Sequence, residues 1–134
     1  MVYKSLKEAI DADAIESGDT IILLKDVKLT DPTSDNCIQI KETMTLDGNH
    51  FRIYCEDSTL PDNARLVNIT GINNKDITIK NITIESANYG NWMRGLNLYQ
   101  VDNINLNIVD SVIQIPHYYA LNIATECTNT TISI

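Results

Sequence analysis

The chain has 134 residues, and its 18 acidic and 10 basic side chains give a formal net charge of −8. A chain of this length forms one domain with a sizeable hydrophobic core. The acidic balance and the lack of a Lys/Arg cluster argue against binding to nucleic acid or to an anionic membrane, because both need concentrated positive charge. No apolar run approaches the roughly 20 residues of a membrane span, so we expect no membrane insertion.

The first predicted element is a helix over Ser5–Glu16. Ser5 and Glu8, three residues apart, form a capping box. Gly18 is suited to end the helix as its C′ residue. The apolar residues that share one face of this helix are Leu6, Ala9, Ile10 and Ile15. Residues 1–18 are therefore predicted to form a cap, and residues 19–134 the body of the domain.

The stretch Asp76–Glu85 predicts a short strand, a corner and a second strand. Its two runs of alternating β-branched residues are typical of half-buried strands. The corner Lys80-Asn81 has no Gly for a two-residue hairpin, so we expect a bend with Asn81 in the left-handed conformation. Similar units recur at comparable intervals and begin at Ile22, Met44, Ile77, Ile104 and Ile132.

A second motif, an amide between two apolar residues, alternates with these units. It occupies 38–40, 67–69, 96–98 and 121–123, at nearly equal intervals. Two motifs that alternate in phase indicate that one winding of a coil is repeated. The sequence therefore predicts a parallel β-helix, in which each winding, or rung, stacks about 4.8 Å above the previous one. The alternative is an antiparallel β-sandwich, which gives no reason for a triplet repeated in register.

Stacking assigns each apolar residue of the two motifs to the interior. The predicted inward residues are Ile22, Leu24, Ile38, Ile40, Met44, Leu46, Val67, Ile69, Ile77, Ile79, Leu96, Leu98, Ile104, Leu106, Leu121, Ile123, Ile132 and Ile134. The central amides of the triplets are predicted to form an outward ladder of Gln39, Asn68, Asn97 and Asn122.

Residues 3–12, 17–27 and 43–49 carry a family resemblance. They resemble the start of pectate-lyase-like right-handed β-helix domains, and are most similar to those in large secreted or wall-anchored bacterial proteins. The resemblance covers the chain as far as Cys55, and the later rungs by pattern. It implies an all-β fold, a right-handed single-stranded parallel β-helix of four to five rungs with an N-terminal α-helical cap, in an extracellular or cell-surface protein. It implies little about activity, because such relatives include lyases, hydrolases, adhesins and non-catalytic repeats.

The sequence stops inside a predicted strand, whereas the family closes its last rung with a capping segment. We therefore expect either that the domain is truncated at this end or that two chains associate end to end across Thr131–Ile134.

The most informative side chains for function are aromatic. Trp92 precedes the third triplet and Pro116-His117-Tyr118-Tyr119 precedes the fourth, so stacking places these two loops together. Aromatic faces beside Asn and Arg suit a sugar, which has apolar C–H faces and a rim of hydroxyl groups. The alternative is that Trp92 and one tyrosine fold inward and cover a corner. The residues predicted to contact carbohydrate are Trp92, Arg94, Asn97, Tyr99, His117, Tyr118, Tyr119 and Asn122.

No residue pattern singles out a catalytic or metal site. Asp47, Asp102 and Asp110 lie near strand ends, but the first two occur in turn sequences, and a calcium site needs several converging oxygen ligands. His50 is expected in a solvated corner. The three cysteines have no metal-binding spacing and are expected as small buried fillers: Cys37, Cys55 and Cys127. We therefore expect no cofactor, no metal and no catalytic residue.

Together these observations predict a non-catalytic β-helical module of a bacterial secreted or cell-surface protein that contacts carbohydrate or a protein partner. Two alternatives stay open: a polysaccharide-degrading enzyme, lyase-like or hydrolase-like, and a structural spacer.

Overall fold

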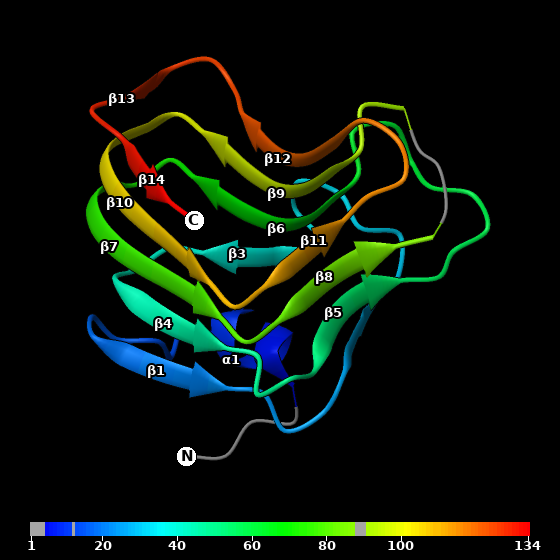
Figure 1. Ribbon diagram of the computed structural model, residues 1–134, viewed down its shortest axis with the longest axis horizontal. Coiled ribbons are helices and arrows are strands. Elements are labelled where there is room, and N and C mark those ends of the chain that lie inside the picture. Colours follow the sequence, from blue (N-terminus) through cyan, green and yellow to red (C-terminus); the bar gives the residue numbers. More distant parts are fainter. Residues whose placement is uncertain (1–4, 12, 88–90) are drawn as a thin grey trace.

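The computed structural model describes residues 5–11, 13–87 and 91–134 and shows a parallel β-solenoid of about four rungs (Figure 1). Each rung passes through three sheets, and every strand pair is parallel. This confirms the predicted β-helix and excludes the antiparallel sandwich. One short helix lies at the end of the solenoid where β1 begins. The described residues include no helix that is long and apolar enough to cross a membrane.

Three sheets run along the solenoid. The first sheet holds β1 (Asp19–Ile22), β4 (Met44–Asp47), β7 (Asn73–Lys80), β10 (Val101–Val109), β13 (Cys127–Thr128) and β14 (Thr131–Ser133). The second sheet holds β2 (Val27–Leu29), β5 (Arg52–Cys55), β8 (Thr83–Ser86) and β11 (Val112–Gln114). The third sheet holds β3 (Ile38–Ile40), β6 (Arg65–Thr70), β9 (Arg94–Tyr99) and β12 (Tyr119–Ile123).

The helix α1 (Leu6–Asp11) is shorter than predicted. Ser5 Oγ accepts a hydrogen bond from the Glu8 amide at 3.1 Å, as a capping residue should. The helix ends well before Glu16 because Asp13 adopts φ = 53°. The amides of Asp13 and Ala14 return to the carbonyls of the last turn, which is the Schellman arrangement with Asp in place of Gly. The prediction that Gly18 ends the helix is therefore wrong. Two buried side chains of α1, Leu6 and Ile10, join the core cluster.

The first rung differs in register from the prediction. Ile21 pairs with Leu46, and Leu23 is buried, whereas Ile22 and Leu24 are 54% and 83% exposed. The prediction that Ile22 and Leu24 point inward is wrong. Four consecutive apolar residues at 21–24 have no alternation, so hydrophobicity alone does not fix their register, and pairing with β4 decides it.

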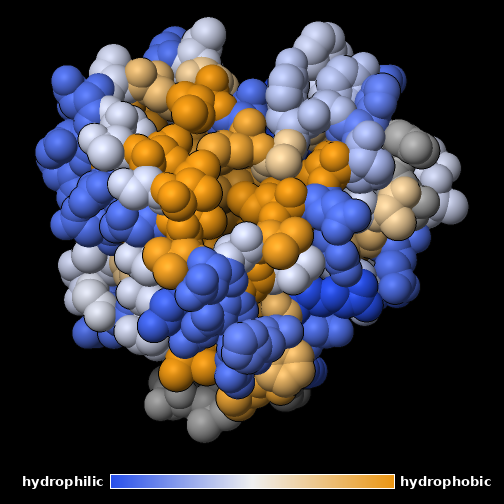
Figure 2. Space-filling view, viewed as in Figure 1, coloured by the Kyte–Doolittle hydropathy of each residue, from blue (hydrophilic) through white to orange (hydrophobic). Residues whose placement is uncertain are grey.

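The fourth and last rungs also depart from the prediction. Ile77 pairs with Leu106 instead of Ile104, although Ile104 is still buried. Ile123 lies over the inward Leu98, as predicted, but Ile123 is 54% and Ile134 is 90% exposed, so neither side chain is buried. Both lie on the last rung, where no further rung of the described residues covers them. Figure 2 shows apolar surface in the centre of this end of the molecule. End-to-end association across Thr131–Ile134 stays a prediction.

The amide ladder of the third sheet forms, but it is buried. Asn68 donates to Gln39 Oε1 at 3.3 Å, Asn97 to Asn68 Oδ1 at 2.8 Å, and Asn122 to Asn97 Oδ1 at 2.7 Å. The prediction placed this ladder on the outer face, but Asn68 and Asn97 are only 1% exposed, so these two amides are shielded from solvent. Each asparagine side-chain amide donates a hydrogen bond to the amide of the previous rung, so these polar groups stay paired although they are buried.

The corners between sheets use residues in the left-handed conformation. Asn81 has φ = 52°, as predicted, and the next rung places Asp110 at the same corner with φ = 47°. Asn74 in β7, Asn103 in β10 and Asn129 between β13 and β14 stack in the same way within the first sheet, with φ between 48° and 57°. Asn and Asp tolerate this conformation better than other residues with a side chain. The high Asn content therefore serves the corners as well as the ladder.

Gly48 occupies the second-rung position of the Asn81 corner. A Cβ there would lie 2.4 Å from Ile82 Cβ and 2.5 Å from the Asn81 carbonyl oxygen. We predict that Gly48→Ala lowers the free energy of unfolding by about 1–3 kcal/mol, because the rung above must move away. Urea unfolding measures this, with exposed Lys25→Ala as the control, expected to stay within about 0.5 kcal/mol of wild type. An unchanged unfolding midpoint for Gly48→Ala would contradict the tight stacking.

The contribution of the amide ladder to stability can be tested by removing one of its members. Asn97→Leu removes both ladder bonds of Asn97 and leaves the buried Asn68 carbonyl oxygen unpaired. We expect a loss of about 1–3 kcal/mol in the free energy of unfolding. Asn105→Leu, at an exposed position of β10, is the matched control, with little expected change. If both variants unfold at the same urea concentration, the ladder contributes no stability.

Candidate functional site: the aromatic corner

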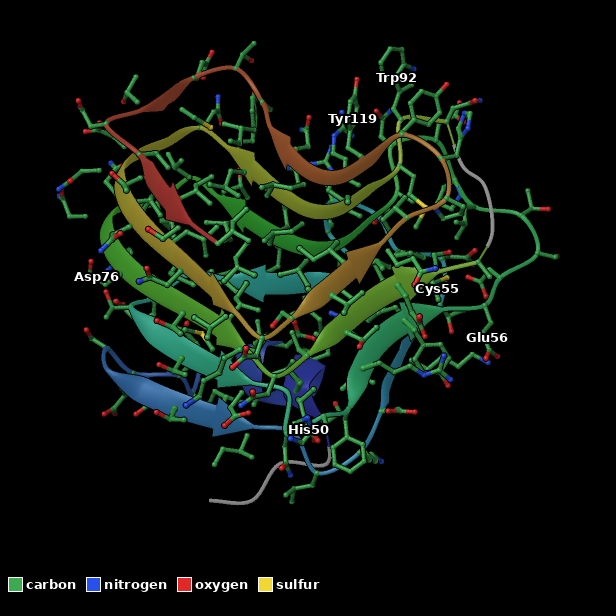
Figure 3. All side chains as sticks on the ribbon, in the orientation of Figure 1. His50, Cys55, Glu56, Asp76, Trp92 and Tyr119 are labelled. Atoms are coloured by element: carbon green, nitrogen blue, oxygen red, sulfur yellow. The ribbon has the colours of Figure 1, made fainter. Side chains whose placement is uncertain are left out.

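Two loops of neighbouring rungs meet at the entrance to the third sheet. Trp92 lies just before β9, and His117 and Tyr118 lie just before β12. The Tyr119 amide donates to the Met93 carbonyl oxygen at 3.0 Å, which joins the two loops. Trp92 and Tyr119 project outward together at this edge of the solenoid (Figure 3). We call the group Trp92, His117, Tyr118 and Tyr119 the aromatic corner.

The four rings contact one another. Trp92 stacks on Tyr118, with centroids 5.2 Å apart and planes 24° apart. Tyr119 lies 6.5 Å from Trp92 and 6.1 Å from Tyr118, and His117 meets the Tyr118 ring edge-on at 4.2 Å. These distances are those of interacting aromatic pairs. The prediction that stacked rungs bring Trp92 to Tyr118 and Tyr119 is confirmed.

The rings are exposed. Trp92 is 51% exposed, Tyr118 40% and Tyr119 38%. The alternative in which Trp92 folds inward to cover the corner is therefore wrong. Contiguous exposed aromatic surface is unfavourable in water and is typical of contact sites for other molecules.

The backbone beneath the two stacked rings is strained. Trp92 has φ = 58° and Tyr118 has φ = 71°. One rung earlier, the position equivalent to Trp92 is occupied by Asn63, with φ = 61°. Asn suits this conformation, whereas a bulky side chain costs roughly 1–2 kcal/mol there. Residues held in such conformations occur most often at functional sites.

Arg94 lies beside the aromatic corner, next to a second arginine. Arg94 pairs in register with Arg65 of the rung below and with Tyr119 of the rung above. Burial and the neighbouring Arg65 lower the pKa of the Arg94 guanidinium. Its Nη1 donates to Asn63 Oδ1 at 3.3 Å, and its buried Nε has no hydrogen-bond partner among the described residues. The corner therefore combines apolar faces with concentrated positive charge.

The other predicted contact residues are placed differently. Asn97 is buried within the ladder, so we leave it out of the contact surface. Asn122 is part-buried at the upper end of the ladder and donates to Asn97. Tyr99 is half-buried at the opposite end of β9 from Arg94. The candidate site therefore consists of the aromatic corner with Arg94.

The titratable residues that the sequence placed near strand ends and corners lie away from the aromatic corner. Asp47 and Asp102 accept hydrogen bonds from corner residues, which lower the pKa of each carboxyl group. His50 is exposed at the corner between the first and second sheets, on the other side of the solenoid from Trp92 (Figure 3). The described residues contain no group of three or more His, Cys, Asp or Glu side chains placed to hold a metal ion.

The cysteines are free. Cys37 and Cys55 are buried, as predicted for small fillers, and burial raises the pKa of each thiol to about 11. Cys127 is only half-buried.

Sequence analysis missed Arg65 and Asn63. A signal for both was present, because Arg65 precedes Arg94, and Asn63 precedes Trp92, by the same interval that separates Asn68 from Asn97 in the amide triplets. The strained backbone at Trp92 and Tyr118 has no such signal, because neither residue favours the left-handed conformation.

No family model matches the chain, and no match was found among curated proteins or solved structures.

Proposed function

We propose that the protein is a non-catalytic β-helical module that binds carbohydrate through the aromatic corner. The observation that carries this proposal is the exposed stack of Trp92, Tyr118 and Tyr119 on strained backbone. Saccharides have apolar C–H faces that pack on aromatic rings, while their hydroxyl groups stay hydrated.

The resemblance to pectate-lyase-like domains of bacterial surface proteins supports the same proposal. It favours a secreted or cell-surface protein, for which polysaccharides are accessible partners. A binding role also accounts for the unfavourable placement of Trp92 and Tyr118, which neither a spacer nor a packing role requires. The enzyme alternative needs a set of converging catalytic groups, and the release of unsaturated product from uronate polymers, described below, tests for it.

Binding can be measured with the protein's own fluorescence, because Trp92 is the only tryptophan. We predict that titration with a panel of polysaccharides changes the Trp92 emission, and that Tyr118→Ala weakens binding at least about tenfold, since stacked aromatic contacts contribute about 1–3 kcal/mol to an interface. A glycan array with Trp92→Ala should lose the same signals. Leu24→Ala, which removes an 83% exposed apolar side chain elsewhere, is the control and should bind normally.

Binding to no member of the panel would contradict the proposal and favour a spacer. Retained binding in Trp92→Ala would place the contact elsewhere on the solenoid. Release of unsaturated product from uronate polymers would instead establish the lyase alternative.

The strained backbone at Trp92 predicts a trade-off between stability and carbohydrate binding. Trp92→Asn places at this corner the residue that the previous rung has there. We expect the free energy of unfolding to rise by about 0.5–1 kcal/mol, because Asn relieves backbone strain while the variant loses ring contacts, and we expect binding to be lost. Trp92→Ala, which lacks the short polar side chain that lets Asn adopt the left-handed conformation, should not gain stability. If Trp92→Asn unfolds at a lower urea concentration than wild type, the ring stack is a stabilising feature of the fold.

A further inference from the structure

Two arginines stand side by side next to the aromatic corner. Arg65 of β6 and Arg94 of β9 are register partners on adjacent parallel strands, which lie about 4.8 Å apart. Like charges placed directly opposite each other on a sheet are destabilising. The repulsion is evident at Arg94, whose pKa is lowered by burial and further by Arg65.

Neither arginine is neutralised by an acidic side chain of the described residues. Among all residues that the structure describes, the ion pairs within 4.0 Å use the cations of Lys7, Lys28, Arg52, Lys75 and Lys80. Arg65 and Arg94 instead contact neutral acceptors of Asn63, at 3.4 Å and 3.3 Å. The nearby carboxylate of Asp62 accepts the side-chain amide of Asn91 at 3.0 Å. The chain has a net charge of −8 and therefore has acidic side chains in excess, yet no acidic side chain of the described residues forms an ion pair with these two arginines.

One donor of this pair is buried and unused. Arg94 Nε has almost no solvent contact and no hydrogen-bond partner within the described part of the chain. A buried unpaired donor is costly, and a cationic one more so. Arg65 and Arg94 are each half-buried as whole side chains, so an oxyanion can approach the solvent-facing part of the pair. It would accept hydrogen bonds from the guanidinium groups and relieve the repulsion between them. Arginine binds carboxylate and sulfate groups well, because its planar fork donates two parallel hydrogen bonds.

We infer that the aromatic corner takes an acidic saccharide, whose carboxylate or sulfate group binds at Arg65 and Arg94 while the sugar ring packs on Trp92, Tyr118 and Tyr119. The inference rests on the proposed function and adds the charge of the ligand to it. Tyr119 connects the two parts of the site, because it belongs to the aromatic corner and is the register partner of Arg94.

The test compares matched charged and neutral polymers. The probes are dextran sulfate against dextran, for sulfate, and polygalacturonate against its methyl ester, for carboxylate, each titrated with Trp92 fluorescence as the readout. We expect at least one charged form to bind about tenfold or more tightly than its neutral partner at low salt, which corresponds to one charge-assisted contact. This preference should shrink as salt rises, because salt screens the exposed part of the interaction.

Variants assign the preference to the two arginines. Arg94→Gln and Arg65→Gln should each reduce the preference for the charged polymer over its neutral partner to about twofold or less. Arg94→Lys keeps a positive charge without the planar fork and should give an intermediate value. Arg52→Gln is the control: Arg52 lies on the second sheet in ion pairs with Asp26 and Glu85, and its loss should leave the preference intact. Thermal unfolding checks that each variant is folded.

The outcomes separate this inference from the proposed function. Equal binding of charged and neutral polymers, weakened for both in Tyr118→Ala, which keeps Trp92 as the reporter, would overturn the acidic ligand and leave the carbohydrate site in place. Binding of no polymer would overturn the proposed function. The Arg94 Nε–H signal in an ¹⁵N NMR spectrum then tests the anion site separately with sodium sulfate: a saturable shift that Arg65→Gln abolishes supports the site, and the absence of any shift overturns it.

Discussion

The whole molecule depends on register between rungs. Parallel backbone hydrogen bonds hold each strand over the equivalent strand of the previous rung, and this places like side chains over one another. The same constraint creates the aliphatic column, the amide ladder and the left-handed corners. It also forces unlike residues together where the sequence changes, as with Asn63 below Trp92 and Arg94 below Tyr119. The candidate site is thus a local departure from the repeat, held by a scaffold that otherwise obeys it.

That departure runs against stability in two ways. Bulky rings occupy backbone positions that suit Asn, and two cations stand together without a carboxylate partner among the described residues. Both features occur in the same part of the solenoid, while the corners around Asn74 and Asn81 keep favourable residues and the second sheet pairs Arg52 with acids. His50, Gln100 and Glu126 also have positive φ, so backbone strain alone does not mark the candidate site. What distinguishes the site is that the strain occurs together with exposed rings and paired arginines.

The sequence predicts the architecture well because periodicity is a property of the chain itself. Alternating triplets at regular intervals specify stacked parallel strands, and the structure confirms this. The inward face is predicted correctly where alternation is strict, as at Ile77 and Ile79, and incorrectly at 21–24, where every residue is apolar. Alternation does not fix the pairing partner, because Ile77 pairs with Leu106 and not with Ile104. Helix length is missed because Asp13 makes a C-cap that usually needs Gly. The pairing of Trp92 with Tyr118 follows from stacking, but ring exposure and the left-handed backbone depend on atomic packing that no pattern reveals.

The most direct test of the stacked rungs is a nuclear Overhauser spectrum of the labelled protein. The account predicts contacts from the side-chain amide protons of Asn97 to those of both Asn68 and Asn122, without the short Hα–Hα contacts of antiparallel strands. Short Hα–Hα contacts between facing strands, or an Asn97 amide that contacts neither partner, would contradict the solenoid and with it the aromatic corner.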